Sequence, residues 1–232
     1  MTLQPTAIIT GASRGIGAAC AKALAQNGFR LALLARNLPE LEEVARHCQA
    51  PAHEILCLQT DLRNESEILS AVQLAKTQFG QIDILINNAG IGSFGPIESL
   101  AYNQLEEMLR INLMAPYKLC QLLLPEMKAR NSGHIVNILS DAARRSFRGG
   151  TAYCASKYAF DGMLGCLREE IAAFNIRLTN VYPGLVNTWF NNKTPQAPAP
   201  GRLEASEVAE YVLKSLFNPD GPDELFLSAP KV

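Results

Sequence analysis

The sequence predicts one α/β domain: a doubly wound parallel sheet of about seven strands with helices on both faces. Short apolar runs with strand-like composition alternate with amphipathic, helix-like segments along the whole chain. The strand-like runs are apolar at nearly every position rather than at every second one, which indicates strands that are buried on both faces. With 232 residues, the chain can fill one such core but is short for two, so residues 1–232 are treated as a single domain.

The first half of the chain contains four of the expected strands and the three helices between them. The apolar runs TAIIT, RLALLA, EILCLQ and IDILIN predict strands at 6–10, 30–35, 54–59 and 82–87. Helical patterns follow the first three runs at 15–26, 39–49 and 65–79. Asn27-Gly28 and Gly80 end the first and third helices, because glycine readily adopts the left-handed conformation that terminates a helix.

The second half repeats the pattern with longer helices. HIVNIL, IRLTNV and ELFL predict strands at 134–139, 176–181 and 224–227, and helical patterns cover 102–130, 151–173 and 206–217. Strand–helix–strand units of this kind connect with a right-handed crossover, so the carboxyl ends of the strands meet at one edge. An irregular stretch rich in Pro and Asn, 191–201, follows one such end, and a loop near 185–202 is expected to cover the substrate there.

Composition excludes several functional classes. The formal net charge is −1 and no basic stripe is present, so a nucleic-acid partner is not expected. The six cysteines show no CxxC spacing and the three histidines form no ligand pattern, which argues against disulfides and against a metal site. The N-terminus lacks a signal-peptide pattern, and no apolar run is long enough to span a membrane. These features predict a cytoplasmic protein.

Two segments carry the chemistry. The turn 10–17, TGASRGIG, joins the first strand to the first helix, where backbone N–H groups can hold a phosphate. Alone it is as consistent with a simple tight turn, and its glycine spacing differs from G-x-G-x-x-G. Tyr153 and Lys157 lie four residues apart and would share one helix face. A cation beside a phenol lowers the phenol pKa, which predicts a proton donor or acceptor near neutral pH.

These segments, with others, resemble the short-chain dehydrogenase/reductase family, whose fold is Rossmann-like. The matching features occur in the family's order over nearly the whole chain. They are T-G-x-x-x-G-x-G at 10–17, N-N-A-G at 87–90, Ser140 after the fifth strand, Y-x-x-x-K at Tyr153 and Lys157, and Pro183-Gly184 followed by Thr188.

The resemblance implies four catalytic residues, Asn112, Ser140, Tyr153 and Lys157. Tyr153 would exchange the proton with the substrate, and Lys157 would lower its pKa and hold the nicotinamide ribose. Ser140 would donate a hydrogen bond to the substrate oxygen, although Ser140 taken alone is better explained as a strand-end cap. Pro116 has no N–H for the Asn112 carbonyl and should bend the helix there, which would leave that carbonyl free for a relay water. A merely tolerated kink is the alternative.

The cofactor is expected to be NADP(H). Arg36 stands at the end of the second strand where an acidic residue would select NAD, and Arg14 lies in the glycine turn, so the two guanidinium groups could clamp a 2′-phosphate. Two exposed surface arginines are the alternative. Asp61 resembles the family's adenine-contacting Asp, or is a helix N-cap. The expected cofactor-binding residues are Gly11, Ser13, Arg14, Gly15, Ile16, Gly17, Arg36, Asp61, Leu62, Asn88, Ala89, Gly90, Tyr153, Lys157, Pro183, Gly184, Val186 and Thr188.

Evidence for the substrate is thinner. The residues expected to bind it are Ser140, Tyr153, Phe94, Trp189 and Phe190. Trp189 and Phe190 would cover an apolar substrate or an oligomer contact equally well. Arg144, Arg145 and Arg148 could face an acidic group or belong to a solvated loop.

The predicted function is transfer of hydride between NADP(H) and a small-molecule carbonyl or secondary alcohol, with tyrosine as the general acid or base. The alternatives are reduction of a 3-oxoacyl thioester on acyl-carrier protein and a non-catalytic NADP-binding sensor. Many 3-oxoacyl reductases carry a basic residue just after the Y-x-x-x-K helix, where this chain has Phe174-Asn175. This difference disfavours a substrate on acyl-carrier protein. Apolar residues on several faces of 102–130 and 151–173 predict a homodimer or homotetramer.

Overall fold

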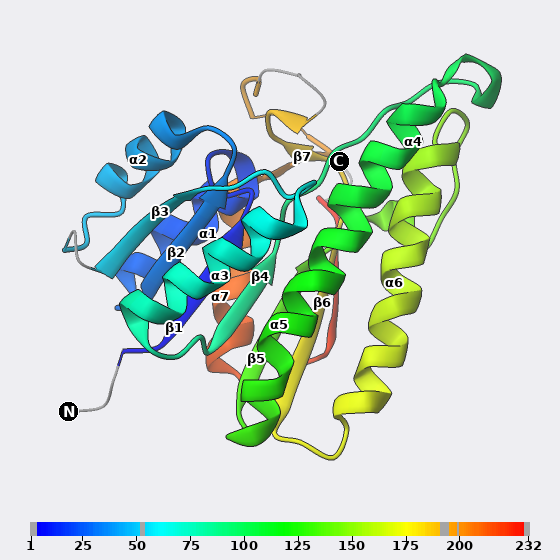
Figure 1. The fold of residues 1–232 in the computed structure, drawn as a ribbon. Coiled ribbons are helices and arrows are strands. Elements are labelled where there is room, and N and C mark those ends of the chain that lie inside the picture. Colours follow the sequence, from blue (N-terminus) through cyan, green and yellow to red (C-terminus); the bar gives the residue numbers. More distant parts are fainter. Residues whose placement is uncertain (1–3, 52–53, 191–194, 199, 230–232) are drawn as a thin grey trace.

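A parallel sheet of seven strands forms the centre of the molecule (Figure 1). The computed structural model describes residues 4–51, 54–190, 195–198 and 200–229. The strand order is β3-β2-β1-β4-β5-β6-β9. The strands are β1 Thr6–Thr10, β2 Arg30–Ala35, β3 Ile55–Gln59, β4 Ile84–Asn87, β5 Gly133–Ile138, β6 Ile176–Pro183 and β9 Glu224–Leu227. The order reverses direction between β1 and β4, so the predicted doubly wound fold is confirmed.

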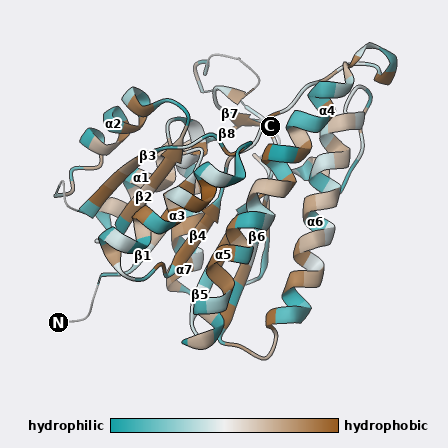
Figure 2. Cartoon of the chain, viewed as in Figure 1, coloured by the Kyte–Doolittle hydropathy of each residue, from teal (hydrophilic) through white to brown (hydrophobic). Residues whose placement is uncertain are grey.

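The helices cover the two faces of the sheet in two sets. One apolar core lies under α3 (Glu65–Phe79), α5 (Ala115–Ala129) and α6 (Thr151–Ile171). The other core lies under α1 (Gly15–Gln26), α2 (Leu38–His47) and α7 (Ala205–Phe217). Successive residues of β1 alternate between them, with Ile8 in the first core and Ala7 and Ile9 in the second. This explains why the strands are apolar throughout, as Figure 2 shows for the sheet between the helix layers.

The long helix expected at 102–130 is interrupted. It consists of α4 (Tyr102–Leu109), a π-helical turn (Arg110–Met114) and α5. The backbone N–H of Ala115 bonds the Arg110 carbonyl five residues back, and Pro116 cannot donate to the Asn112 carbonyl. The irregularity therefore lies where Pro116 predicts it, but it is a π turn and not a simple proline bend.

A second, small sheet lies beyond the carboxyl end of β6. In it, β7, Val186–Asn187, pairs in parallel with β8, Leu203–Glu204. This pairing was not predicted, because two-residue strands have no readable periodicity. The expected substrate-covering loop near 185–202 includes β7 and ends directly before β8, and residues 191–194 and 199 lie outside the described residues. Among the described helices, none has the length and hydropathy required to cross a membrane.

Candidate active site

The four residues expected to carry the chemistry converge at the carboxyl edge of the sheet. Asn112 lies in the π turn, Ser140 follows β5, and Tyr153 and Lys157 occupy successive turns of α6. Asn112, Tyr153 and Lys157 are buried. The Lys157 Nζ lies 6.0 Å from the centroid of the Tyr153 ring and donates to the Ile138 carbonyl at 3.3 Å. The shared helix face predicted for Tyr153 and Lys157 is therefore present.

Ser140 is a cap at the end of the fifth strand, as one of its two expected roles required. It is the N-cap of a short 3₁₀ helix, Asp141–Ala143, and its Oγ accepts the Ala142 N–H at 3.1 Å. The same hydroxyl donates to the Asp141 carboxylate at 3.2 Å, and its proximity to the Tyr153 phenol lowers the pKa of that tyrosine. The cap therefore fixes the serine with its hydroxyl near the expected reacting group.

The pKa of Tyr153 moves in the direction opposite to the one expected. Burial raises it to about 12, while the nearby Ser140 hydroxyl lowers it by less. Burial also lowers the pKa of Lys157 to about 8. The expectation that Lys157 lowers the tyrosine pKa is thus wrong for the protein without cofactor. Desolvation favours the neutral form of both groups, and the ammonium is turned toward Ile138 rather than toward the phenol oxygen.

The Asn112 side chain is fully hydrogen-bonded. Its Oδ1 accepts the Ile91 N–H at 2.9 Å, and its Nδ2 donates at 2.9 Å to the Ile91 carbonyl and to the Ser156 hydroxyl. Ser156 in turn donates to the Tyr153 carbonyl at 2.8 Å. Sequence reasoning missed Ser156, although its place directly before Lys157 in a buried helix face was a usable signal. The bonds join the π turn, α6 and the segment after β4.

The glycine turn depends on close backbone approach. Gly11 has φ +63°, and a Cβ on Gly17 would lie 2.3 Å from the Gly11 carbonyl oxygen. The Asn88 side chain donates to the Thr10 carbonyl at 2.8 Å, and the Thr10 hydroxyl accepts the N–H groups of Asn88 and Ala89, both at 3.0 Å. The segment 87–90 is therefore bonded directly to the turn. Thr10 is a further residue that the site requires and that was not predicted.

These residues fit a dinucleotide. The N-terminus of α1 has neither a side-chain cap nor an acidic residue in its first turn, so its N–H groups suit a pyrophosphate. Thr188 lies over Gly15, where an added Cβ would be 3.3 Å from the Thr188 methyl. A Cβ on Gly90 would lie 3.6 Å from Lys157 Nζ, so this glycine leaves space beside the ammonium.

The remaining expected cofactor residues surround this region. Ser13, Ile16 and Val186 are partly buried, Leu62 and Pro183 are buried, and the Gly184 N–H donates to the Leu227 carbonyl at 2.8 Å. The last bond attaches the segment after β6 to the edge strand β9.

Arg14 and Arg36 are exposed, and within the described part of the chain neither guanidinium has an ion-pair or hydrogen-bond partner. Arg36 lines a cavity of about 380 Å³ with Gln59, Asp61 and Glu67. Asp61 is not a helix N-cap, because Asn64 caps α3. The Asp61 carboxylate is bound by Arg63, whose hydrogen bond lowers the pKa of that carboxyl.

An aromatic cluster surrounds Tyr153. The ring centroids of Phe94 and Phe190 lie 5.2 Å and 5.7 Å from that of Tyr153, and Phe147 lies 6.0 Å from Phe94. Phe94 and Phe147 are each 41% exposed, so they present apolar surface beside the phenol. Trp189 is 43% exposed and belongs to no ring contact described here. Phe147, which the sequence places in the expected lining of the substrate site, packs on Gly150.

The described residues contain no cluster of His, Cys, Asp and Glu that could hold a metal ion.

Comparison with known proteins agrees with this geometry. The family model for short chain dehydrogenases matches residues 5–199. An uncharacterized oxidoreductase of Staphylococcus saprophyticus is 33% identical over 214 residues, which cover 92% of this chain and 91% of that protein. The structure of an alcohol dehydrogenase from Thermococcus sibiricus, complexed with 5-hydroxy-NADP, has a TM-score of 0.91 and 30% identity, covering 99% of this chain and 100% of that one.

A second similar structure is the 3-ketoacyl-(acyl-carrier-protein) reductase of Brucella melitensis, complexed with NADH. Its TM-score is 0.86 and its identity 25%, covering 97% of this chain and 98% of that one. The matched family model spans most of the chain, and the glycine turn, the buried Tyr153–Lys157 pair and the sheet order all agree with it. The chain therefore belongs to the short-chain dehydrogenase family of oxidoreductases.

Proposed function

We propose that this protein is an NADP(H)-dependent carbonyl reductase or alcohol dehydrogenase. One observation carries the proposal: Tyr153 lies near Ser140 and one helical turn from Lys157, whose ammonium lies beside the segment 87–90 that is bonded to a glycine turn suited to a dinucleotide. Bound NADP(H) would supply or accept the hydride. Tyr153, neutral because burial raises its pKa to about 12, holds the proton that a reduced carbonyl oxygen needs. Ser140 is placed to donate a hydrogen bond to that oxygen.

Lys157 and Asn112 have supporting roles in this proposed mechanism. The Lys157 ammonium is expected to bind the ribose hydroxyls of the nicotinamide end in the space that Gly90 leaves. Asn112 holds the segment after β4 against α6 through its bonds to Ile91 and Ser156. Its backbone carbonyl, to which Pro116 has no N–H to donate, would bind the relay water.

NADP(H) rather than NAD(H) is favoured by the two unpaired guanidinium groups of Arg14 and Arg36. Arginine binds phosphate with a planar fork, and position 36 has no carboxylate to accept a ribose hydroxyl. The Thermococcus alcohol dehydrogenase, complexed with an NADP derivative, is consistent with this choice. The Brucella reductase, complexed with NADH, keeps NAD(H) as the competing cofactor.

The aromatic cluster of Phe94, Phe147 and Phe190 favours an apolar carbonyl compound as the substrate. Reduction of a 3-oxoacyl thioester remains the second candidate, supported by the likeness to the Brucella reductase.

The test is turnover of NADPH with a panel of apolar ketones and aldehydes, in the wild type and in Tyr153→Phe. The variant keeps the ring and its packing but loses the proton, so kcat should fall by about 10² to 10⁴ while the NADPH Kd changes little. Tyr153→Phe turnover close to that of the wild type would exclude the tyrosine as proton donor. NADPH binding without turnover on any carbonyl would favour the sensor.

A further inference from the structure

Arg144 is the residue at which the segment carrying Ser140 turns away from the site. Residues 140–145, here called the Ser140 turn, are closed by bonds from the Ala143 N–H to the Ser140 carbonyl at 3.0 Å and from the Arg144 N–H to the Asp141 carbonyl at 2.9 Å. Ser140 stands at one end of this turn and Arg144 near the other.

The Arg144 guanidinium contacts three separate elements. Its Nη2 donates to the Tyr182 hydroxyl of β6 at 2.8 Å and to the Glu224 carboxylate of β9 at 2.6 Å. Its Nε lies 3.2 Å from the Asp161 carboxylate of α6. The sequence left Arg144 either as a group facing an acidic substrate or as a solvated residue. Two carboxylates of this chain occupy the guanidinium, so it does not face an acidic substrate, whereas the side chain is still 44% exposed, as the solvated alternative expects.

A buried tyrosine completes the cluster. Tyr182 is 1% exposed, and its hydroxyl donates to Asp161 at 2.6 Å. Its ring stacks on Phe226 with centroids 4.6 Å apart and planes at 9°, and the Arg144 guanidinium lies 4.9 Å from the Tyr182 centroid. Burial and the bond to Asp161 raise the pKa of Tyr182, so it remains a donor across the physiological range.

Asp161 connects this cluster to the site. Tyr153, Lys157 and Asp161 follow one another at four-residue intervals on α6, so they lie on one face of the helix. The ion pair between Arg144 and Asp161 therefore joins the Ser140 turn to the helix that carries Tyr153.

We infer that Arg144 is a positioning residue, which holds the Ser140 turn against α6 and β9 and thereby sets the placement of the Ser140 hydroxyl relative to the Tyr153 phenol. Its consequence for turnover rests on the proposed function, whereas its effect on the turn does not. An error of about 1 Å in such a placement can cost about 10²-fold in rate.

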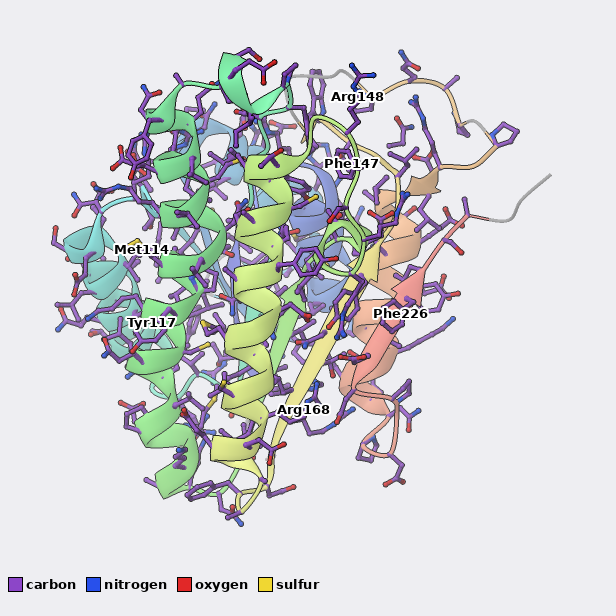
Figure 3. All side chains as sticks on the ribbon, turned by 90° about the vertical axis from the view of Figure 1, so that its right-hand side faces the viewer. Met114, Tyr117, Phe147, Arg148, Arg168 and Phe226 are labelled. Carbon is purple, nitrogen blue, oxygen red and sulfur yellow. The ribbon has the colours of Figure 1, made fainter. Side chains whose placement is uncertain are left out.

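Arg168 provides a matched control. It lies on α6 and pairs with Asp223, the residue before β9, but among the described residues no bond joins it to the Ser140 turn. Figure 3 shows Arg168 near the far end of α6 and Phe226 on β9. Arg144→Met and Arg168→Met therefore each remove one guanidinium link between α6 and the β9 edge. Only the first removes a link to the turn.

Cys154 reports on the turn without any need for turnover. It is buried, and its Sγ donates to the Arg145 carbonyl at 3.8 Å. Its labelling by N-ethylmaleimide, followed by mass spectrometry of its peptide, should accelerate about tenfold or more in Arg144→Met and by less than about twofold in Arg168→Met. Equal labelling of Cys154 in both variants would refute the inference, even if the wild type proves inactive on carbonyls.

The second measurement is the rate. In Arg144→Met, kcat should fall about tenfold to hundredfold with the NADPH Kd within about twofold of wild type. The basic limb of the rate profile should also move to higher pH, because the Ser140 hydroxyl lowers the pKa of Tyr153. Arg144→Lys keeps the positive charge but loses the planar guanidinium fork, so its kcat should lie between those of the wild type and Arg144→Met. A loss of thermal stability with unchanged kcat and pH profile would make Arg144 structural only.

Discussion

Burial of Lys157 makes the free energy of unfolding depend on pH, and a variant of this one residue can isolate its contribution. The buried environment lowers the lysine pKa from 10.5 to about 8 in the folded protein. Below pH 8 the lysine is charged in both states, and the folded state bears the cost of desolvation. Between pH 8 and 10.5 the unfolded chain holds the proton and the folded protein does not. Rising pH therefore stabilises the folded state in this interval, by about 1.4 kcal/mol per pH unit.

The perturbation is Lys157→Met, which retains an unbranched apolar chain of similar length and removes the charge. The shift corresponds to about 3 kcal/mol in total, of which about 2 to 3 kcal/mol develops between pH 8 and 10. The variant should therefore exceed the wild type in stability at pH 7 by about 2 to 3 kcal/mol more than it does at pH 10. Contributions of other groups that titrate in the same interval cancel in the comparison.

Urea unfolding of the cofactor-free proteins, followed by circular dichroism at pH 7 and pH 10, measures this difference. Lys22→Met is the control, because Lys22 lies exposed on α1 and should leave the pH dependence unchanged. A constant difference between Lys157→Met and wild type at the two pH values would refute the reasoning. It would mean that Lys157 is solvated or paired in solution.

Three further outcomes are expected. Arg36→Asp should shift the ratio of NADPH to NADH affinity about tenfold to hundredfold towards NADH; equal wild-type affinities in fluorescence titration would contradict this. Pro116→Ala restores an N–H opposite the Asn112 carbonyl and should lower kcat, and unchanged kcat would leave the π turn a structural feature. Met114 of the π turn and Tyr117 of α5, both labelled in Figure 3, are each more than half exposed, and light scattering should give the mass of a homodimer or larger assembly rather than the 25.3 kDa of one chain.

The elements of the main sheet were predictable because each rests on a local signal. The strands are apolar on both faces, and most helix ends agree with the expected ones to within two residues, with Gly80 directly after α3. The small β7–β8 sheet was not predictable, because its pairing joins two dipeptides that are separated by an irregular segment. The π turn was predicted only as a bend. Proline at 116 reveals a lost hydrogen bond, but not the register that the backbone adopts around it.

In the site, the sequence identified residue types but not their hydrogen-bond partners. The Tyr153–Lys157 spacing correctly placed both groups on one helix face, yet the direction of the tyrosine pKa was wrong, because burial cannot be read from spacing. Asp61 looked like a cap or an adenine ligand, and its binding to Arg63 depends on a contact two residues away that no motif records. The contacts of Arg144 and Thr10 were not predicted either, because their hydrogen-bond partners are distant in sequence.

The electrostatics of the pair bear on the direction of the reaction. Reduction requires a protonated phenol, and burial keeps Tyr153 protonated at every pH below about 12. Oxidation requires the phenolate, which is disfavoured by the same burial and by the nearby Asp141 carboxylate. Only Ser140, through its hydroxyl, opposes these effects within the cofactor-free site, and Ser140 is held in place by the turn that ends near Arg144. In the proposed mechanism, the cofactor-free site would therefore favour the protonated phenol that donates to a carbonyl oxygen, and the position of the Ser140 hydroxyl would affect how strongly the phenol is favoured.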